Sequence, residues 1–253
     1  MLRKVTATRY VTPLREGGSL PAVVEADDDG LYVVKFRAAG QGLKALVAEV
    51  IVAELARTAG LRVPEIVLVE LAAELGHTEP DPEIQELVTA SAGLNCGIDF
   101  LPGALDYNPA QSGEMDALEA SKVVWLDAFT TNVDRTPRNP NLLVWHRQTW
   151  LIDHGAALYQ HHSDRDLVAR AREPFPLIGE HVLLPVASRL RAADERMAAA
   201  LDPAAVAAAV ALVPDEWLGP EPVAVRRRYV EYLCERLVAP RGFVDEAELA
   251  RGT

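Results

Sequence analysis

The sequence is poor in cysteine and carries fewer basic than acidic residues. Cys96 and Cys234 are its two cysteines and lie far apart, so a disulfide framework is not expected and a reducing compartment is the default. Lys and Arg number 25 against 37 Asp and Glu, which gives a formal net charge of −12. Because binding to phosphate backbones depends on Lys and Arg, this balance disfavours a nucleic-acid partner or an anionic membrane surface. The negative charge weakly favours a basic peptide or a cationic small molecule.

A long apolar run is also missing. The sequence does not open with a basic patch followed by an apolar core of signal-peptide length. Its longest apolar run, residues 204–213, is about half of what a bilayer span needs. We therefore expect a soluble, cytoplasmic protein without a membrane partner. The length of 253 residues suits one large domain or two small lobes.

The first third has the composition of strands with one helix. Residues 31–37, LYVVKFR, are rich in β-branched and aromatic side chains and follow an acidic turn, which predicts a strand. From Leu43 the apolar residues recur at helical spacing and stop at Gly60, which predicts a helix over 43–59. Further strands are predicted at 21–26 and 66–71, and residues 94–103 are predicted to be a short strand that runs into a Pro-Gly turn. A glycine loop is predicted at 15–20 between two extended segments, and a further loop at 77–83.

The remainder is predicted to be mostly helical. Helices are expected at 116–130, 164–172, 185–200, 203–212 and 222–238, with Asp202 as an N-cap and Pro203 at the first helical position. A β-rich first part and a helical second part indicate an α+β architecture with two lobes. We place their boundary at 101/102, which gives an amino-terminal lobe over 1–101 and a carboxy-terminal lobe over 102–253.

The stretch NVDRTPRNPNLLVWHRQTWLIDHG, residues 132–155, gathers oxygen-bearing side chains around two apolar runs. The runs LLVW and TWLI are predicted to form a hairpin, which would carry Asp153 back beside Asn139. A carboxylate and an amide oxygen brought together in this way suit a hard divalent cation such as Mg²⁺. Asp134, five residues before Asn139, would be a third oxygen-bearing group in the same pocket and free to accept a proton.

These motifs resemble those of the protein-kinase fold, in which an Asp-x-x-x-x-Asn catalytic loop precedes an Asp-x-Gly metal motif. Here DRTPRN begins at Asp134 and DHG begins at Asp153. The resemblance implies that Asn139 and Asp153 hold Mg²⁺ on ATP, and that Asp134 orients an acceptor hydroxyl and takes its proton. Asn141 stays open as an alternative amide ligand.

The kinase resemblance also implies a strand lysine that pairs with a helical glutamate. Lys35 lies in YVVKF, which is similar to the Val-Ala-Ile-Lys strand of kinases. Glu49 follows on the next predicted helix with apolar neighbours, so we expect it to face inward and pair with Lys35. Glu54 is the competing candidate, but it can pair locally with Arg57.

Other residues implied by the resemblance would contact the nucleotide or the acceptor. They are Gly17, Gly18 and Ser19 as a loop over the phosphates, Val33 and Ile152 as apolar walls of the adenine site, and Arg138 at the γ-phosphate or the acceptor. Glycine allows the close backbone approach that a phosphate loop needs. A plain turn is the alternative for the two glycines.

In detail, the chain is similar to the HipA-like kinases, with phosphoinositide kinases as more distant relatives. The catalytic loop lacks the His-Arg lead of eukaryotic protein kinases but shares Asp-Arg with phosphoinositide-kinase loops, and Arg138 matches a basic residue of HipA-like proteins. Residues 48–65, AEVIVAELARTAGLRVPE, also look HipA-like. The resemblance covers about residues 15–160 and is to minimal HipA-like domains without the extra amino-terminal subdomain, which disfavours a toxin role.

The resemblance implies a bilobal protein-kinase-like fold and an ATP- and Mg²⁺-dependent kinase that acts on a Ser/Thr or small-molecule hydroxyl. A binding module that holds nucleotide or a protein partner without chemistry is the second hypothesis. In a third, Asp134 and Asp153 cap turns in an unrelated two-lobed protein, and Lys35 would then lie far from Asp153. The sequence does not identify the acceptor or the oligomeric state.

Overall fold

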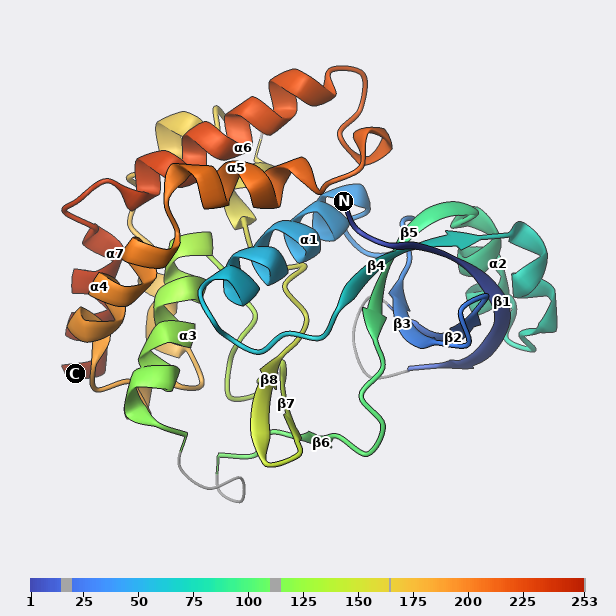
Figure 1. The fold of residues 1–253 in the computed structure, drawn as a ribbon, viewed down its shortest axis with the longest axis horizontal. Helices are drawn as coiled ribbons and strands as arrows, with labels where there is room; N and C mark the ends of the chain where they lie inside the picture. The colour runs from blue at the N-terminus through green and yellow to red at the C-terminus, as the bar shows by residue number, and fades with distance from the viewer. Residues whose placement is uncertain (15–19, 110–114, 164, 253) are drawn as a thin grey trace.

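The first part of the chain forms a closed five-stranded β-barrel (Figure 1). The computed structural model describes residues 1–14, 20–109, 115–163 and 165–252. The barrel strands are β1 (Lys4–Pro13), β2 (Ala22–Ala26), β3 (Leu31–Lys35), β4 (Ile66–Leu71) and β5 (Gly93–Asp99), in the order β1-β2-β3-β5-β4. β1 pairs antiparallel with β2 and parallel with β4, which closes the ring. Closure leaves no free strand edge, and β3 and β5 are held side by side next to the second part of the molecule.

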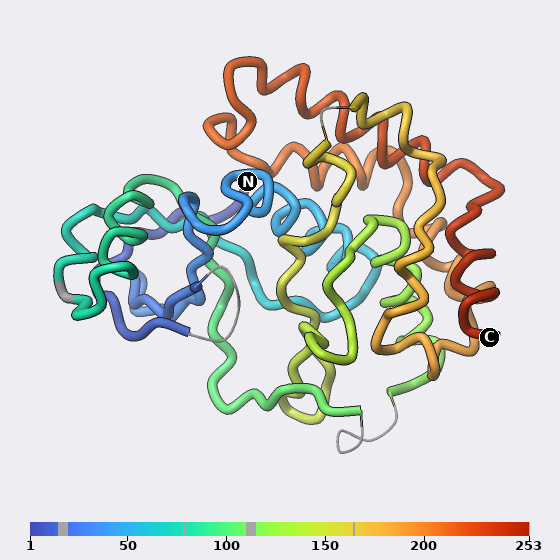
Figure 2. Tube along the Cα trace, turned by 180° about the vertical axis from the view of Figure 1, so that it is seen from behind, coloured from blue at the N-terminus to red at the C-terminus, as the bar shows by residue number. Residues whose placement is uncertain are grey.

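The second part is mainly helical, and Figure 2 shows the chain leaving β5 and running along one side of the molecule to reach it. Its main helices are α3 (Ala117–Thr130), α4 (Leu190–Ala200), α5 (Pro203–Ala211), α6 (Pro222–Leu237) and α7 (Gly242–Gly252). A small sheet of β6 (Leu105–Asp106), β7 (Leu142–Trp145) and β8 (Gln148–Leu151) lies beside α3. Within the described residues, no helix is both long and apolar enough to cross a membrane.

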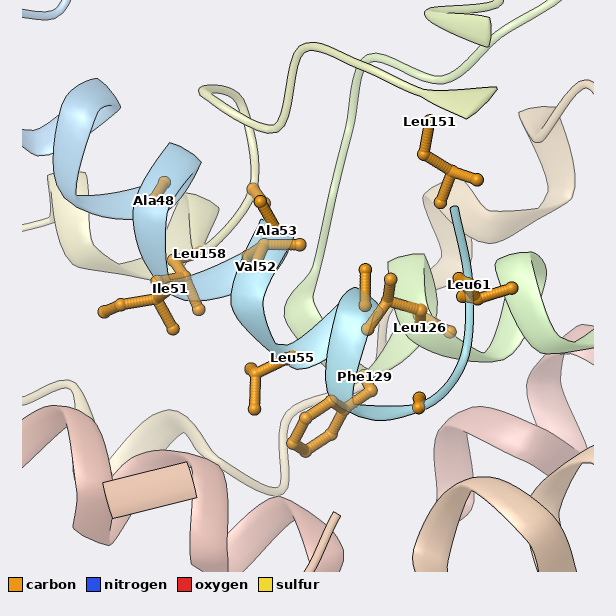
Figure 3. Packing of buried hydrophobic residues seen from close by; sticks show 14 of the residues in the cluster. Ala48, Ile51, Val52, Ala53, Leu55, Leu61, Leu126, Phe129, Leu151 and Leu158 are labelled. Atoms are coloured by element: carbon orange, nitrogen blue, oxygen red, sulfur yellow. The ribbon is translucent and has the colours of Figure 1, made fainter. Parts of the chain in front are cut away.

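Helix α1 (Leu43–Thr58) joins the two parts. It begins after Gly42, which has a positive φ of 66°, and the chain turns away at Gly60, with a φ of 75°. The side chains of Ile51 and Leu55 are fully buried and pack in one core with Phe129 of α3 (Figure 3). The barrel encloses a separate apolar cluster. Helix α1 thus shares its core with the helical part, although it precedes the 101/102 division, which stays a prediction.

A second tie fixes the barrel to the helical part. Trp217, in the short 3₁₀ helix η6 (Asp215–Trp217), donates its ring N–H to the Leu94 carbonyl of β5 at 3.1 Å. Beside it, the guanidinium of Arg37 contacts the Glu216 carboxylate at 3.0 Å. These contacts and the packing of α1 hold β3 and β5 against the half that carries the catalytic loop.

Most predicted elements are confirmed. The strands at 21–26, 31–37 and 66–71, the helices at 43–59, 116–130, 203–212 and 222–238, and the hairpin of LLVW with TWLI all form, with ends within two residues of those expected. Asp202 caps α5 by accepting a hydrogen bond from Ala205 N at 2.7 Å. The extended segment expected before residue 15 is β1.

Three predicted segments are wrong. Residues 77–83 are not a plain loop, because α2 (Pro82–Ala90) begins there with Asp81 as its N-cap. This Asp-Pro start is the same signal that identifies α5. The helix predicted at 164–172 is reduced to a 3₁₀ turn, η3 (Val168–Arg170), and α4 begins at Leu190 rather than 185, after the 3₁₀ turn η5 (Leu184–Val186). Helix α7 was not predicted from the sequence.

Candidate active site

Lys35 lies at the end of β3 and is almost enclosed, with 10% of its side chain exposed. Its ammonium group lies 3.1 Å from the Glu49 carboxylate on α1 and also contacts the Asp153 carboxylate. Burial lowers the pKa of Lys35, but the charges of Glu49 and Asp153 outweigh it, so the pKa is raised and the amine stays protonated. Segments 118 residues apart in the chain therefore meet at one buried cation.

Glu49 has a second partner in the metal motif. Besides Lys35, its Oε2 accepts a hydrogen bond from the backbone N–H of His154 at 2.9 Å. The competing candidate, Glu54, instead pairs with Arg57 one turn away on the same helix. The structure therefore brings Glu49, and not Glu54, to the lysine.

Asp153 lies two residues after the end of β8 and has a positive φ of 54°. The hairpin register pairs Leu142 with Leu151, and Ile152 N donates to the Asn141 carbonyl at 3.1 Å. Asp153 is therefore returned to the end of the catalytic loop, as the hairpin predicted. Burial alone would raise the pKa of Asp153, but Lys35 lowers it below the usual range, which keeps the carboxylate ionised.

Asp134 is held by two amides. Its Oδ2 accepts hydrogen bonds from Nδ2 of Asn139 at 2.7 Å and from Nδ2 of Asn141 at 3.2 Å. Burial raises the pKa of Asp134, and the nearby negative charge of Asp153 adds to this, although the two amides oppose it. The carboxylate is thus fixed in direction and more basic than a free aspartate.

The structure describes three of the remaining predicted residues. Val33, beside Lys35 on β3, and Ile152, beside Asp153, are each half-buried. Arg138 is exposed on the catalytic loop. The predicted phosphate loop of Gly17, Gly18 and Ser19 lies outside the described residues.

A sealed polar network behind the catalytic loop was not recognised in the sequence. Asp127 of α3 accepts hydrogen bonds from Arg135 Nε at 2.5 Å, from His181 Nε2 at 2.9 Å and from Asn132 Nδ2 at 3.0 Å. The side chains of Asp127 and Arg135 are both fully buried. Arg135 lowers the pKa of Asp127 well below its usual range, more than offsetting the effect of burial.

Arg135 connects this network to both ends of the hairpin. Its guanidinium donates to the carbonyls of Asn141 and Ile152, and its Nη2 lies 3.3 Å from Nδ1 of His154. Burial lowers the pKa of His154 to about 3, so its ring is neutral and Nδ1 is the acceptor. A single acid inside the apolar helix segment VVWLDAF was the available sequence signal, because a lone buried carboxylate needs a partner.

The donor set fits a divalent metal on a phosphate ligand. Each amide uses its nitrogen toward Asp134, which directs Oδ1 of Asn139 and of Asn141 away from that bond. Together with the Asp153 carboxylate, these are the hard oxygen donors that Mg²⁺ prefers. Lys35 adds a fixed positive charge on the barrel side of the same point.

A barrel lysine paired with a helical glutamate, above a helical part that carries an Asp-Asn catalytic loop and an Asp-x-Gly turn, defines a protein-kinase-like fold. The sequence model of the HipA-like kinases matches residues 8–232, and the chain belongs to this family.

One solved structure supports the fold, and a second is a weaker match. The Helicobacter pylori proinflammatory kinase CtkA matches with a TM-score of 0.63 and 13% identity, and the match covers 99% of each chain. The Golgi casein kinase with Mn/ADP bound matches with a TM-score of 0.47 and 15% identity, covering 95% of this chain and 74% of that one. No curated protein matches the chain.

Proposed function

We propose that this chain is an ATP- and Mg²⁺-dependent phosphotransferase that moves the γ-phosphoryl group to the hydroxyl of a Ser/Thr residue or of a small molecule. The observation that carries the proposal is the meeting of Lys35, Glu49 and Asp153 from three distant segments at one buried point. Membership of the HipA-like kinase family and the kinase fold support a kinase-type phosphotransferase. The nature of the acceptor is part of the proposal.

Phosphoryl transfer is mainly a matter of positioning and of neutralising charge on the transferred oxygens. In this proposal Lys35 contacts the α- and β-phosphates of ATP, and Glu49 holds the lysine in place. Asp153 and the amide oxygen of Asn139 hold Mg²⁺, which neutralises charge on the phosphates when bound. Val33 and Ile152 pack against the adenine.

Asp134 is the proposed base for the acceptor hydroxyl. It takes the proton of the acceptor hydroxyl as that oxygen bonds to the γ-phosphorus and the bond from this phosphorus to the bridging oxygen of ADP breaks. The two amides that hold its carboxylate orient it, and its raised pKa makes it a better proton acceptor than an exposed aspartate. Arg138, exposed on the same loop, would contact the γ-phosphate or the acceptor.

Transfer from labelled ATP tests this function. We expect autophosphorylation or transfer to a protein in a lysate by the wild-type chain with Mg²⁺, and loss of both in Asp134→Ala and Asp153→Ala. Transfer that survives both substitutions would contradict the assigned roles.

A nucleotide- or protein-binding module without chemistry is the second candidate. It is favoured by one observation: Lys35 pairs directly with Asp153, and both amides with Asp134, so the groups needed for catalysis engage one another. Calorimetry with ATP and Mg²⁺, followed by long incubation, separates the two functions. Binding without ADP formation supports the module, and binding with turnover supports the kinase.

A further inference from the structure

A pocket opens directly beside the catalytic loop, on the face of the helical part that carries the residues after Asp134. It encloses about 710 Å³. Its walls are Thr136, Pro137 and Arg138 of the loop, residues 179–182 with Leu184 and Pro185, and Ala250 and Arg251 at the end of α7. The backbone N–H of Thr136 donates to the Asp134 carbonyl at 2.9 Å, so the pocket begins two residues from the proposed base.

The two long walls of this pocket are held together. Val182 N donates to the Arg135 carbonyl at 3.0 Å, which ties the 179–185 wall to the catalytic loop. The buried His181 ring donates to Asp127 at 2.9 Å and accepts from Leu183 N at 3.0 Å. Because Asp127 also binds Arg135, both walls are fixed to the same sealed network. The pocket is therefore a preformed feature of the fold.

The charge at its rim is locally positive in a strongly acidic chain. Arg138 and Arg251 are both exposed at the pocket, and among the described residues neither guanidinium is in an ion pair. Glu180 also lines the pocket and opposes one of these charges. The lining also includes the apolar side chains of Pro137, Val182 and Leu184.

We propose that this pocket binds an acidic segment of a polypeptide acceptor, whose neighbouring Ser or Thr hydroxyl is then presented to Asp134; the proposal rests on the proposed function. Carboxylates on the segment would pair with Arg138 and Arg251. A volume of about 710 Å³ with apolar side chains in its lining suits amino-acid side chains better than a free phosphate ion. Local charge thus favours an acidic acceptor, although the net charge of the chain favours a basic one.

Peptide binding without ATP tests this site independently of catalysis. The probes are two fluorescein-labelled peptides, each with one serine and one leucine, flanked by Glu in the first and by Lys in the second. Fluorescence anisotropy should show that the wild-type chain binds the Glu peptide at least tenfold more tightly than the Lys peptide. Arg251→Glu should weaken binding of the Glu peptide at least fivefold and strengthen binding of the Lys peptide.

Arg228→Glu is the matched control, because it makes the same charge change at an exposed position on α6. Equal binding of the two peptides to the wild type, or equal effects of the two substitutions, would overturn the proposal. Inorganic phosphate, added as a competitor, tests whether the pocket instead binds a small anion. Displacement of the Glu peptide by phosphate at an affinity equal to the peptide's own would also overturn it.

Failure here is distinguishable from failure of the kinase function. Charge-selective peptide binding without transfer from labelled ATP would support the docking site and contradict the phosphotransferase function. Transfer without any preference for the Glu peptide would support the phosphotransferase function and contradict the docking site.

Discussion

Two ion-pair clusters lie near the catalytic loop and differ in their access to solvent. The first cluster, Lys35 with Glu49 and Asp153, is open, because the Asp153 side chain is 39% exposed. The second, Asp127 with Arg135 and His181, is sealed, and the side chains of Asp127 and Arg135 are fully buried. An exposed carboxylate can exchange its lysine for a metal or a phosphate ligand, whereas a sealed one can only hold the protein together. We infer that the open cluster serves chemistry and the sealed cluster serves position.

The electrostatics of the two clusters support this division. In the sealed cluster both oxygens of Asp127 have a donor. Arg135 uses Nη1 on the backbone carbonyls of Asn141 and Ile152, which flank the hairpin, and Nη2 on Nδ1 of His154. Such a network tolerates no loss of a partner, since an uncompensated buried charge is costly. In the open cluster, Lys35 keeps a second carboxylate, Glu49, if Asp153 is engaged elsewhere.

The largest expected effect is on transfer. We expect Asp134→Ala and Asp153→Ala to reduce phosphoryl transfer by roughly a thousandfold or more, because each removes a group that acts on the transferred phosphate or the acceptor. Their thermal midpoints should stay close to that of the wild type, since both side chains lie at the open side. A large drop in the thermal midpoint of either variant would show that its side chain also stabilises the fold, which would contradict the division between the two clusters.

The next effect is on stability. Asp127→Asn leaves the buried Arg135 guanidinium without its counter-charge, and we expect it to lower the free energy of unfolding by roughly 3–5 kcal/mol. Asp245→Asn is the control, because its pair with Arg191 is well exposed and should contribute about 1 kcal/mol or less. Chemical denaturation measures both. Equal losses would mean that the sealed cluster has no special structural role.

A smaller effect separates the two amides. We expect Asn139→Ala to raise the Mg²⁺ concentration needed for half-maximal ATP binding by about 10- to 100-fold, on the scale of losing a group that supports a metal site. Asn141→Ala should raise it less, because the Asn141 side chain is more buried than that of Asn139, which is exposed. Calorimetry at several Mg²⁺ concentrations measures the shift. A larger effect for Asn141→Ala would make Asn141 the metal ligand.

The smallest effect is a pH dependence of stability. His154 faces Arg135, Asp127, Lys35 and Asp153, and burial lowers its pKa from 6.5 to about 3. The unfolded chain binds a proton at this residue near pH 6.5, and the folded chain binds it only near pH 3. Stability should therefore fall as pH is lowered from 6.5, by about 1.4 kcal/mol per pH unit for this residue.

His154→Gln is the variant that tests this contribution, and the slope of unfolding free energy against pH between 6.5 and 5 should be shallower in it than in the wild type. His146→Gln is the matched control, because it makes the same substitution at an exposed position in the hairpin turn. An unchanged slope in His154→Gln would show that this ring does not contribute.

The open cluster could be predicted from the sequence, and the sealed one could not. The members of the open cluster lie in spaced motifs, as does the neighbouring Asp134. The spacing of a hairpin is enough to bring Asp153 back to the loop. Asp127 and His181 are 54 residues apart with no local pattern between them. Only the path of the chain through 176–186 brings them together.

The helices and strands show the same limit: local patterns predict an element, but long-range packing does not follow from them. The periodic helices and strands were predicted because their apolar residues repeat, as in α1 and α3. The segment 164–172 was predicted as a helix, but tertiary contacts replace it with short turns: the buried Arg236 guanidinium binds the Ala171 carbonyl at 2.8 Å. The assignment of α1 to the core of the helical part also depends on packing rather than on pattern.

Transfer from labelled ATP to proteins of a cell lysate, with Mg²⁺ and equal amounts of wild type and Asp134→Ala, tests the central claim most directly. We expect labelled protein with the wild type and none above background with Asp134→Ala, while the two proteins unfold at similar temperatures. Equal labelling by both, or no labelling by a wild-type chain that binds ATP and Mg²⁺, would contradict the assignment of Asp134 and the neighbouring open cluster to phosphoryl transfer.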